Sequence, residues 1–433
     1  MVNRSELRSQ AKELRLAANY KGSLPLYQEL WEETKAEVDA AGVLYCLRKE
    51  KEYDKAFSFT EHINAGPYKM DWLKNELAWT YIEGRLLKYT NDITVSQVIE
   101  TANKVLELNP DPIAVKTAVF IVLKAAKQHN RWDIIDEWAS KVDPNSLSSD
   151  PIMTKNRPGW SDQSSWYNYR IRSYIELGYN DKALELVKTI EDRFPRELKH
   201  FLRLKGLAAF RLGLLQDAMD VYKRLCAVPK PDWWFLHEYA NVIREMAQKD
   251  DNVSMKEQAL ELMCRAADDV ARSNKLEAML KILWDIANIS TELKREEASL
   301  PHLLLLKLIR EDNGWPISLQ VSEDIQRFSL KFGNNYLSKT KCELLNECRK
   351  IWSNAMTHQK VLLDSIKVTG KVILGPENRL YCFIIAGERN CFCPKSKLPP
   401  GLKEGDLVKA EIISAFDSKK KQDGWKAIKV WKG

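Results

Sequence analysis

Two stretches of the chain, residues 177–190 (LGYNDKALELVKTI) and residues 212–225 (LGLLQDAMDVYKRL), share one pattern of small and apolar residues. Gly178 and Gly213 are 35 residues apart, as are Ala183 and Ala218, and a proline follows each alanine after about a dozen residues. A repeat of this length predicts a helical hairpin. The glycine permits a tight turn and close approach, the alanine lets the second helix pack closely, and the proline ends that helix.

The same helical pattern extends in both directions from these two repeats. Between about residues 5 and 363, apolar residues recur at spacings of three and four, as in Leu7, Ala11, Leu14 and Ala18. A polar stretch with two prolines, within residues 146–165, predicts a linker. We therefore predict degenerate helical repeats over residues 1–145, a linker over 146–163, further repeats over 164–363 that end in a long helix starting near Lys341, and a separate module over 364–433.

The glycine, alanine and proline spacing resembles the tetratricopeptide repeat, most clearly over residues 164–230. The resemblance implies a solenoid whose inner helices line a groove for peptides or protein partners. Projecting the spacing places these residues in the groove: Asn168, Arg172, His200, Arg203, Phe210, His237 and Asn241. The mixture of Arg, His and Asn suits an acidic peptide or phosphates. The alternative is that these positions are ordinary solvated helix faces.

Charge is concentrated at the C-terminus. Residues 361–433 hold 14 basic and eight acidic residues, a net charge of +6, whereas the other 360 residues hold 53 basic and 52 acidic ones. A basic module attracts polyanions such as nucleic acid, although many basic surfaces are only solvated. No apolar run approaches the roughly 20 residues that cross a bilayer, and the charged N-terminus has no apolar signal-peptide core, so we expect a cytoplasmic chain without membrane contact.

The C-terminal module changes from helical to strand periodicity after Ser365. Five short runs rich in strand formers begin near residues 366, 379, 390, 407 and 425, with glycine, proline and lysine-rich turns between them. Five short strands in so small a module predict a closed β-barrel. The predicted fold class is therefore mainly α, a tetratricopeptide-like solenoid followed by a small five-stranded barrel of the OB type.

The barrel segment resembles the cold-shock domain. The strand Arg379-Leu380-Tyr381-Cys382-Phe383-Ile384 matches the family's first nucleic-acid motif, and Cys391-Phe392-Cys393-Pro394-Lys395-Ser396 matches the second. The resemblance implies that bases stack on Tyr381, Phe383 and Phe392. Leu374, Leu380, Cys382, Pro394 and Lys395 depart from the family pattern.

Other residues of the module could complete a single-stranded RNA or DNA site. Basic residues that could pair with phosphates are Arg379, Arg389, Lys395 and Lys397, together with the loop lysines Lys419, Lys420 and Lys421. Trp425 could replace a stacking ring that the family has and this chain lacks. The alternative is a barrel that uses its aromatic residues for its own core or for docking on the helices.

Signals for metal binding and catalysis are weak. Cys391 and Cys393 point the same way from one predicted strand, but no second pair or His cluster lies near them in sequence, so we expect reduced thiols, no metal and no cofactor. The chain has no Gly-rich phosphate loop and no G-x-S-x-G elbow, so we expect no enzyme.

The combination of tetratricopeptide-like repeats with a cold-shock-like barrel is similar to proteins of TOTE-type prokaryotic conflict systems. That similarity implies an adaptor in which the barrel binds single-stranded nucleic acid and the solenoid recruits a protein partner. A protein–protein scaffold that binds no nucleic acid and a translation or RNA-processing factor are the alternatives. The oligomeric state and the partner's identity do not follow from the sequence.

Overall fold

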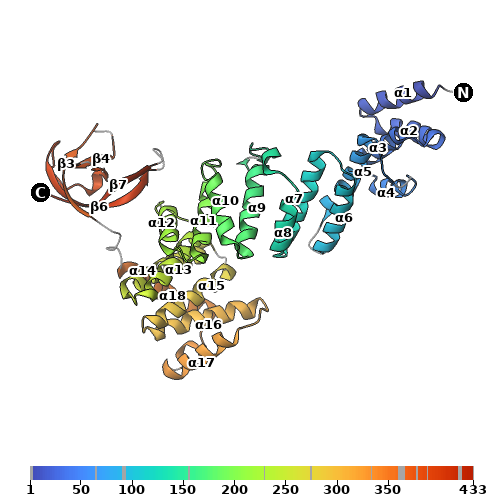
Figure 1. Cartoon of the computed structure of the whole chain (residues 1–433). Coiled ribbons are helices and arrows are strands. Elements are labelled where there is room, and N and C mark those ends of the chain that lie inside the picture. The colour runs from blue at the N-terminus through green and yellow to red at the C-terminus, as the bar shows by residue number, and fades with distance from the viewer. Residues whose placement is uncertain are drawn as a thin grey trace. The chain divides into compact units, whose positions relative to one another are not determined.

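The computed structural model describes residues 3–63, 66–89, 94–154, 157–228, 230–273, 276–332, 334–358, 366–376, 379–387, 389–417 and 422–432. The chain divides into two compact units, residues 1–197 and 198–433. Consecutive helices pack side by side as hairpins within each unit (Figure 1). In the described part of the chain, no helix is long and apolar enough to cross a membrane.

The first unit is helical apart from one short hairpin of strands. Its elements are α1 (Arg4–Leu16), α2 (Tyr20–Thr34), α3 (Glu37–Lys49), α4 (Tyr53–Thr60), α5 (Asp71–Gly84), η1 (Leu86–Lys88), α6 (Val95–Glu107), α7 (Pro112–Gln128), α8 (Trp132–Ala139), η2 (Pro144–Ser146), β1 (Met153–Thr154), β2 (Arg157–Pro158), α9 (Asp162–Glu176) and α10 (Asn180–Ile190).

Local sequence explains where several of these helices begin. Thr94 and Gln97 form a capping box at the start of α6, in which each side chain bonds the backbone N–H of the other. Asp111 accepts hydrogen bonds from the first backbone N–H groups of α7, and Pro112 occupies the first helical position, where no N–H is needed. The start of α7 is therefore specified by residues next to one another in the sequence.

Two kinds of contact hold α3 against its neighbours. Gly42 lies so close to the Tyr27 ring of α2 that a Cβ at this position would meet the ring at 2.4 Å. On the other side, Arg48 is buried and ion-paired to Glu76 at 2.8 Å and to Glu83 at 2.7 Å, both on α5. A buried guanidinium that bonds two carboxylates fixes the register of α3 on α5.

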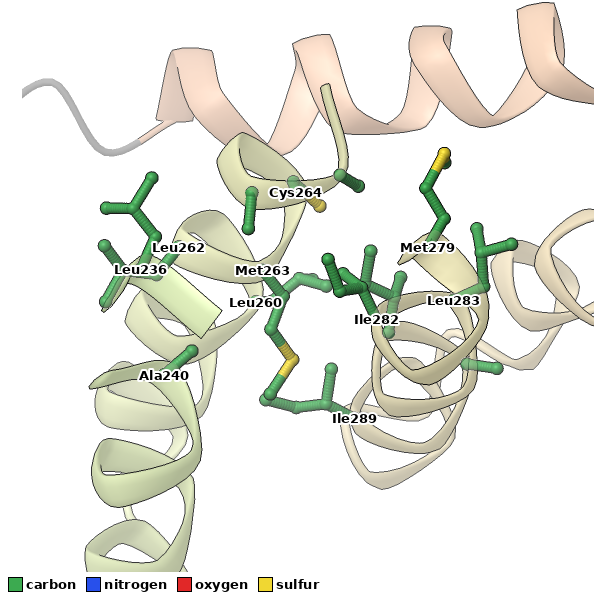
Figure 2. Close-up of a cluster of buried hydrophobic side chains, with 14 of the residues drawn as sticks. Leu236, Ala240, Leu260, Leu262, Met263, Cys264, Met279, Ile282, Leu283 and Ile289 are labelled. Carbon is green, nitrogen blue, oxygen red and sulfur yellow. The ribbon is translucent and has the colours of Figure 1, made fainter. Parts of the chain in front are cut away.

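The second unit begins with a larger helical core. Its helical elements are α11 (Leu198–Arg211), α12 (Leu215–Cys226), α13 (Trp233–Lys249), α14 (Val253–Arg272), η3 (Leu276–Met279), α15 (Leu280–Glu292), α16 (Glu296–Asp312), α17 (Leu319–Phe332), η4 (Asn334–Tyr336) and α18 (Lys341–His358). Side chains from α13, α14 and α15 meet in this core, including Leu236, Met263 and Ile282 (Figure 2). Trp352 of α18 is fully buried in the same core.

The repeat pattern has the structural meaning that its spacing predicts, with one correction. Ala183 and Ala218 are fully buried, and Gly178 and Gly213 end their helices with φ of +85° and +75°. These glycines therefore adopt a left-handed backbone conformation that residues with a Cβ rarely adopt. No atom lies within 4 Å of the position that a Cβ would occupy, so neither glycine marks a close contact between helices. The close approach occurs at Gly206 instead, where a Cβ would lie 2.9 Å from the Tyr222 ring.

The C-terminal module is a closed barrel of five strands, as predicted. The strands are β3 (Ile366–Ile373), β4 (Tyr381–Ala386), β5 (Arg389–Pro394), β6 (Leu407–Asp417) and β7 (Gln422–Lys432), with the short η5 (Lys395–Lys397) after β5. Their order around the barrel is β3-β4-β5-β7-β6, and β6 pairs with β3 to close it. All pairs are antiparallel except β5 and β7. Five strands in a closed Greek-key barrel are the architecture of OB folds.

The barrel interior is small and apolar. Val372, Cys382, Ile384, Cys391, Cys393, Val408, Ala410, Ile412 and Ala427 form its buried core. Gly370 is also buried, and a Cβ there would lie 2.6 Å from the carbonyl oxygen of Ile385 on β4. The described part of the chain thus confirms the predicted fold class, an array of helical hairpins followed by a five-stranded barrel.

Candidate nucleic-acid interface on the barrel and the predicted groove positions

Three aromatic rings form one cluster on the outside of the barrel. Cys382 and Ile384 of β4 point into the core, so the alternating residues Tyr381 and Phe383 point outward. Phe392 lies between the buried Cys391 and Cys393 on β5, and its side chain is 37% exposed. The structure thus brings together the three side chains that the cold-shock resemblance selects.

The three rings of this aromatic cluster lie close together and are inclined to one another. The Tyr381 and Phe392 ring centroids lie 5.3 Å apart with an interplanar angle of 34°, and the Tyr381 and Phe383 centroids lie 5.8 Å apart, edge to face. Phe383 and Phe392 are register partners across β4 and β5, with centroids 6.3 Å apart. The cluster therefore presents ring faces and edges to solvent on the strands that OB folds use for oligonucleotides.

The strand register continues the cluster on both sides. Ile373 of β3 pairs with Phe383, and Lys426 of β7 pairs with Phe392, so the four residues form one row across four strands. Lys426 is exposed at the end of this row. The sequence pattern does not indicate Lys426, because its proximity to Phe392 depends on the parallel pairing of β5 with β7.

The predicted basic residues occupy different places around the cluster. The Arg379 guanidinium carbon lies 5.7 Å from the Tyr381 ring centroid and borders the cluster. The Lys395 and Lys397 ammonium groups donate to the carbonyl oxygens of Pro376 at 3.0 Å and Ile428 at 2.9 Å. An ammonium has three donors, so each of these bonds leaves donors for a phosphate.

Trp425 and its neighbours form a separate feature. Trp425 is the register partner of the inward-facing Cys391 and packs partly buried against the barrel core. The Arg389 guanidinium carbon lies 5.0 Å from its ring centroid. Among the described ring contacts, none joins Trp425 to the three-ring cluster. Lys419, Lys420 and Lys421 lie outside the described residues.

The cysteines beneath the cluster are buried thiols. Cys382 and Cys393 are register partners, and the Cys382 thiol donates to the Cys393 carbonyl oxygen at 3.4 Å. Burial raises the pKa of Cys382 and Cys391, and it raises the pKa of Cys393 to about 12. In the described part of the chain, no three His, Cys, Asp or Glu side chains are placed to hold a metal ion.

Two predicted groove residues lie on α9 of the first unit. The Arg172 guanidinium carbon lies 5.2 Å from the Trp132 ring centroid, and Asn168 is half-buried one turn earlier. Lys127 of α7 lies nearby, with its ammonium 5.6 Å from the Tyr169 ring centroid. Burial and the positive charge of Arg172 lower the pKa of Lys127. Two cations thus lie near one another beside aromatic rings, and Arg172 also pairs with Glu176 of its own helix, with its Nε 3.9 Å from the carboxylate.

The remaining predicted groove residues, in the second unit, make contacts within the helical array. Arg203 of α11 makes a bidentate ion pair with Glu238 of α13, with Nε 2.9 Å from both carboxylate oxygens. His237 Nε2 lies 2.7 Å from Asp285 Oδ2 of α15. These two side chains therefore join α11 to α13 and α13 to α15, in each case passing over the helix between them in the chain.

The other groove candidates of this unit adjoin the same helices. Asn241 Nδ2 lies 3.4 Å from His237 Nε2, and Phe210 packs against the helical core. His200 is half-buried, and desolvation lowers its pKa.

Two solved structures of tetratricopeptide repeat proteins are similar to this chain. A tetratricopeptide repeat protein from Parabacteroides merdae ATCC 43184 is 12% identical, and the match covers 68% of this chain and 98% of that one, with a TM-score of 0.29. The tetratricopeptide domain of P58(IPK) is 11% identical, with 83% and 99% covered and a TM-score of 0.23. Because both TM-scores are low, the solenoid fold is assigned from the helical hairpins of this chain and not from these two structures. No protein-family model and no curated protein sequence matches the chain.

Proposed function

We propose that this chain is a non-catalytic cytoplasmic adaptor that binds single-stranded RNA or DNA on the outer face of β4 and β5. The observation that carries the proposal is the cluster of Tyr381, Phe383 and Phe392, whose ring centroids lie 5.3–6.3 Å apart on the outside of the barrel. Bases stack on such rings irrespective of sequence, with about 1–3 kcal/mol per base. A cold-shock-like role for the barrel is part of this proposal.

Charge around the cluster supports a nucleic-acid ligand. Arg379 borders Tyr381, Lys426 lies beside Phe392, and Lys395 retains free N–H donors. Phosphate contacts by such groups release counterions, so affinity falls with salt by roughly 0.7 log units per contact for each tenfold rise in salt. Stacking and charge together predict a sequence-tolerant, salt-dependent interface.

The helical array supplies the second half of the adaptor, a surface for a protein partner. Arg203 is ion-paired and His237 is hydrogen-bonded to side chains on other helices, whereas the pair of Arg172 with Glu176, at 3.9 Å, stays within α9, so the cations of the first unit are the better candidates. Lys127 and Arg172 lie close together over Tyr169 and Trp132, and their combined charge suits an acidic segment of the partner. By its similarity to TOTE-type proteins, the adaptor would act in defence against foreign nucleic acid.

One binding experiment tests the nucleic-acid half. Fluorescence anisotropy would follow labelled single-stranded RNA and DNA binding to the full chain across a salt series. The triple variant Tyr381→Ala, Phe383→Ala and Phe392→Ala should lose binding, while Trp315→Ala should keep it. Trp315 is a matched control because it is 40% exposed and lies in the helical array. A folded triple variant that binds like the wild type would refute the proposal.

A protein–protein scaffold is the second candidate function, and one observation favours it. Ile373, Ile385 and Leu407 are exposed aliphatic side chains on β3, β4 and β6, and aliphatic groups suit a protein surface better than a base. A chain of this kind would bind no oligonucleotide at low salt. Substitution of Ile373, Ile385 and Leu407 by serine would instead abolish capture of a protein partner in pull-down experiments, and the triple aromatic variant would keep that partner.

A further inference from the structure

Lysines occupy exposed positions on three strands of the barrel beyond the aromatic cluster. The inward residues of β3, β6 and β7 are buried, among them Val372, Ala410 and Ala427. The lysines of these strands are all exposed: Lys367, Lys371, Lys409, Lys426, Lys429 and Lys432. Among the described side chains of the three strands, Glu411 is the one carboxylate. Glu411 is the register partner of both Lys367 and Lys429, and six lysines against this one described carboxylate leave this part of the barrel surface basic.

An exposed indole lies within this basic surface. Trp431 is 42% exposed, and its register partner on β6 is Lys409. The buried Ala427 and the exposed Lys426, Lys429 and Trp431 show which side of β7 faces solvent. A large ring held in water between ammonium groups is suited to stack on a flat, anionic ligand.

Strand β7 connects this indole to the aromatic cluster. Lys426 is the register partner of Phe392, so β7 passes the cluster at one point and then continues to Trp431. Five residues of strand span roughly 17 Å. The exposed side chains Lys426, Lys429 and Trp431 mark this path in order along the strand.

We propose that Trp431 is a second stacking position, and that a single strand of nucleic acid continues from the aromatic cluster along β7 to reach it. Lys409, Lys426 and Lys429 contact the phosphates between the two stacking positions. This inference rests on the proposed nucleic-acid function and extends it by a site on β6 and β7. The extended site binds a longer oligonucleotide than the cluster alone does.

The length of the oligonucleotide makes the proposal testable. Full-length protein would be titrated with labelled oligouridine and oligodeoxythymidine of about four and about twelve nucleotides, lengths within the range of OB-fold sites. Trp431→Ala should weaken binding of the longer oligomers by about 5- to 150-fold, the size expected for one lost stacking contact. It should leave the shorter ones unchanged. Trp431→Phe keeps a ring and should retain most of the affinity.

Two controls separate stacking from charge and from misfolding. Trp431→Ala should not change binding of inorganic polyphosphate, which has no bases to stack. The double variant Lys409→Gln and Lys429→Gln keeps the ring. It should reduce the slope of log affinity against log salt concentration by roughly 1.4, which is the sum for two phosphate contacts on a single strand. These lysines are exposed on β6 and β7, so their substitution leaves the barrel core intact.

The outcomes distinguish this inference from the function on which it rests. If Trp431→Ala binds long oligomers like the wild type while the triple aromatic variant loses them, the second position is wrong and the proposed function stands. If Trp431→Ala weakens polyphosphate and oligonucleotides equally, Trp431 does not stack and the inference is also wrong. If the wild-type chain binds no oligonucleotide at low salt, both fail.

Discussion

Trp352 Nε1 donates a hydrogen bond to His302 Nε2 over 2.9 Å, inside the core that α16 and α18 share. His302 Nδ1 lies 2.7 Å from the Ala298 carbonyl oxygen, so it donates there. Both contacts together require the neutral imidazole with its proton on Nδ1. Burial lowers the pKa of His302 to about 4, so α18 is held by a histidine that resists protonation.

The first prediction is an acid-dependent loss of stability. The pKa of His302 is lower in the folded than in the unfolded chain, so the unfolded state binds more protons between the two pKa values. The free energy of unfolding should therefore fall as the pH drops from about 6.5 towards about 4, by up to about 3 kcal/mol from this residue. Urea unfolding across this pH range measures it. His302→Phe should flatten this part of the profile, and an unchanged profile would contradict the assignment.

The second prediction concerns the tryptophan of the same pair. Trp352→Phe keeps an aromatic ring in the core but removes the N–H that His302 Nε2 accepts. A buried acceptor left without a partner costs about 1–3 kcal/mol. Denaturant unfolding should show that loss. Trp284→Phe is the comparison, since Trp284 is only partly buried at the edge of this core, and it should cost less.

The third prediction uses the contact between Gly42 and Tyr27. Alanine favours a helix over glycine by about 1 kcal/mol, so Gly42→Ala in an open helix would stabilise the chain. Here the added Cβ meets the buried Tyr27 ring at 2.4 Å, and the overpacking should destabilise it by about 1–3 kcal/mol net. Thermal unfolding measures the sign. Adding Tyr27→Leu should make the Gly42→Ala step less unfavourable, and a purely additive cycle would argue against the clash.

The fourth prediction tests whether Arg203 holds helices together. Its guanidinium contacts both oxygens of Glu238, and the Tyr222 hydroxyl donates to the same carboxylate at 3.1 Å. Arg203→Ala should lower the free energy of unfolding by about 1–2 kcal/mol, as denaturant unfolding would measure. This value is below that of a fully buried pair because the site is partly exposed. A double-mutant cycle with Glu238→Gln should show coupling between the two side chains. Without coupling, Arg203 would remain a candidate for binding a partner.

The fifth prediction separates the cysteines by reactivity. Cys342 is exposed, whereas burial raises the pKa of Cys226 and Cys393 to about 12 and leaves little thiolate at neutral pH. A thiol reagent at about pH 8 should label Cys342 first in the native chain, as mass spectrometry of the digested protein would show. Rapid labelling of Cys393 would mean that the barrel opens under native conditions.

Much of this architecture follows from local sequence. The glycine and alanine spacing predicts the hairpins because a positive-φ turn and a small buried residue are local requirements, which Gly178 and Ala183 meet. Strand alternation likewise predicts that Tyr381 and Phe383 share one face. What the local pattern misplaces is the close helix contact, which lies at Gly206 rather than at the turn glycines.

The candidate site could be predicted only in part. The pairing of β5 with β7 places Lys426 beside Phe392 and turns Trp425 towards the core. Trp425 and Lys426 are adjacent in sequence, yet they face opposite sides of the strand. The helical spacing selects Arg203 and His237 as groove residues, yet their partners Glu238 and Asp285 come from other helices. In each case the deciding neighbour lies on an element that the local pattern does not specify.

The sequence by itself determined the helical hairpins, the five strands and the outward face of β4, because turn conformation, side-chain volume and strand alternation depend on residues near one another in the chain. Only the tertiary structure decided which polar side chains are already ion-paired and which cations border the aromatic cluster. Those outcomes depend on strand register and helix packing, where residues such as Phe392 and Lys426 meet across 34 positions of sequence.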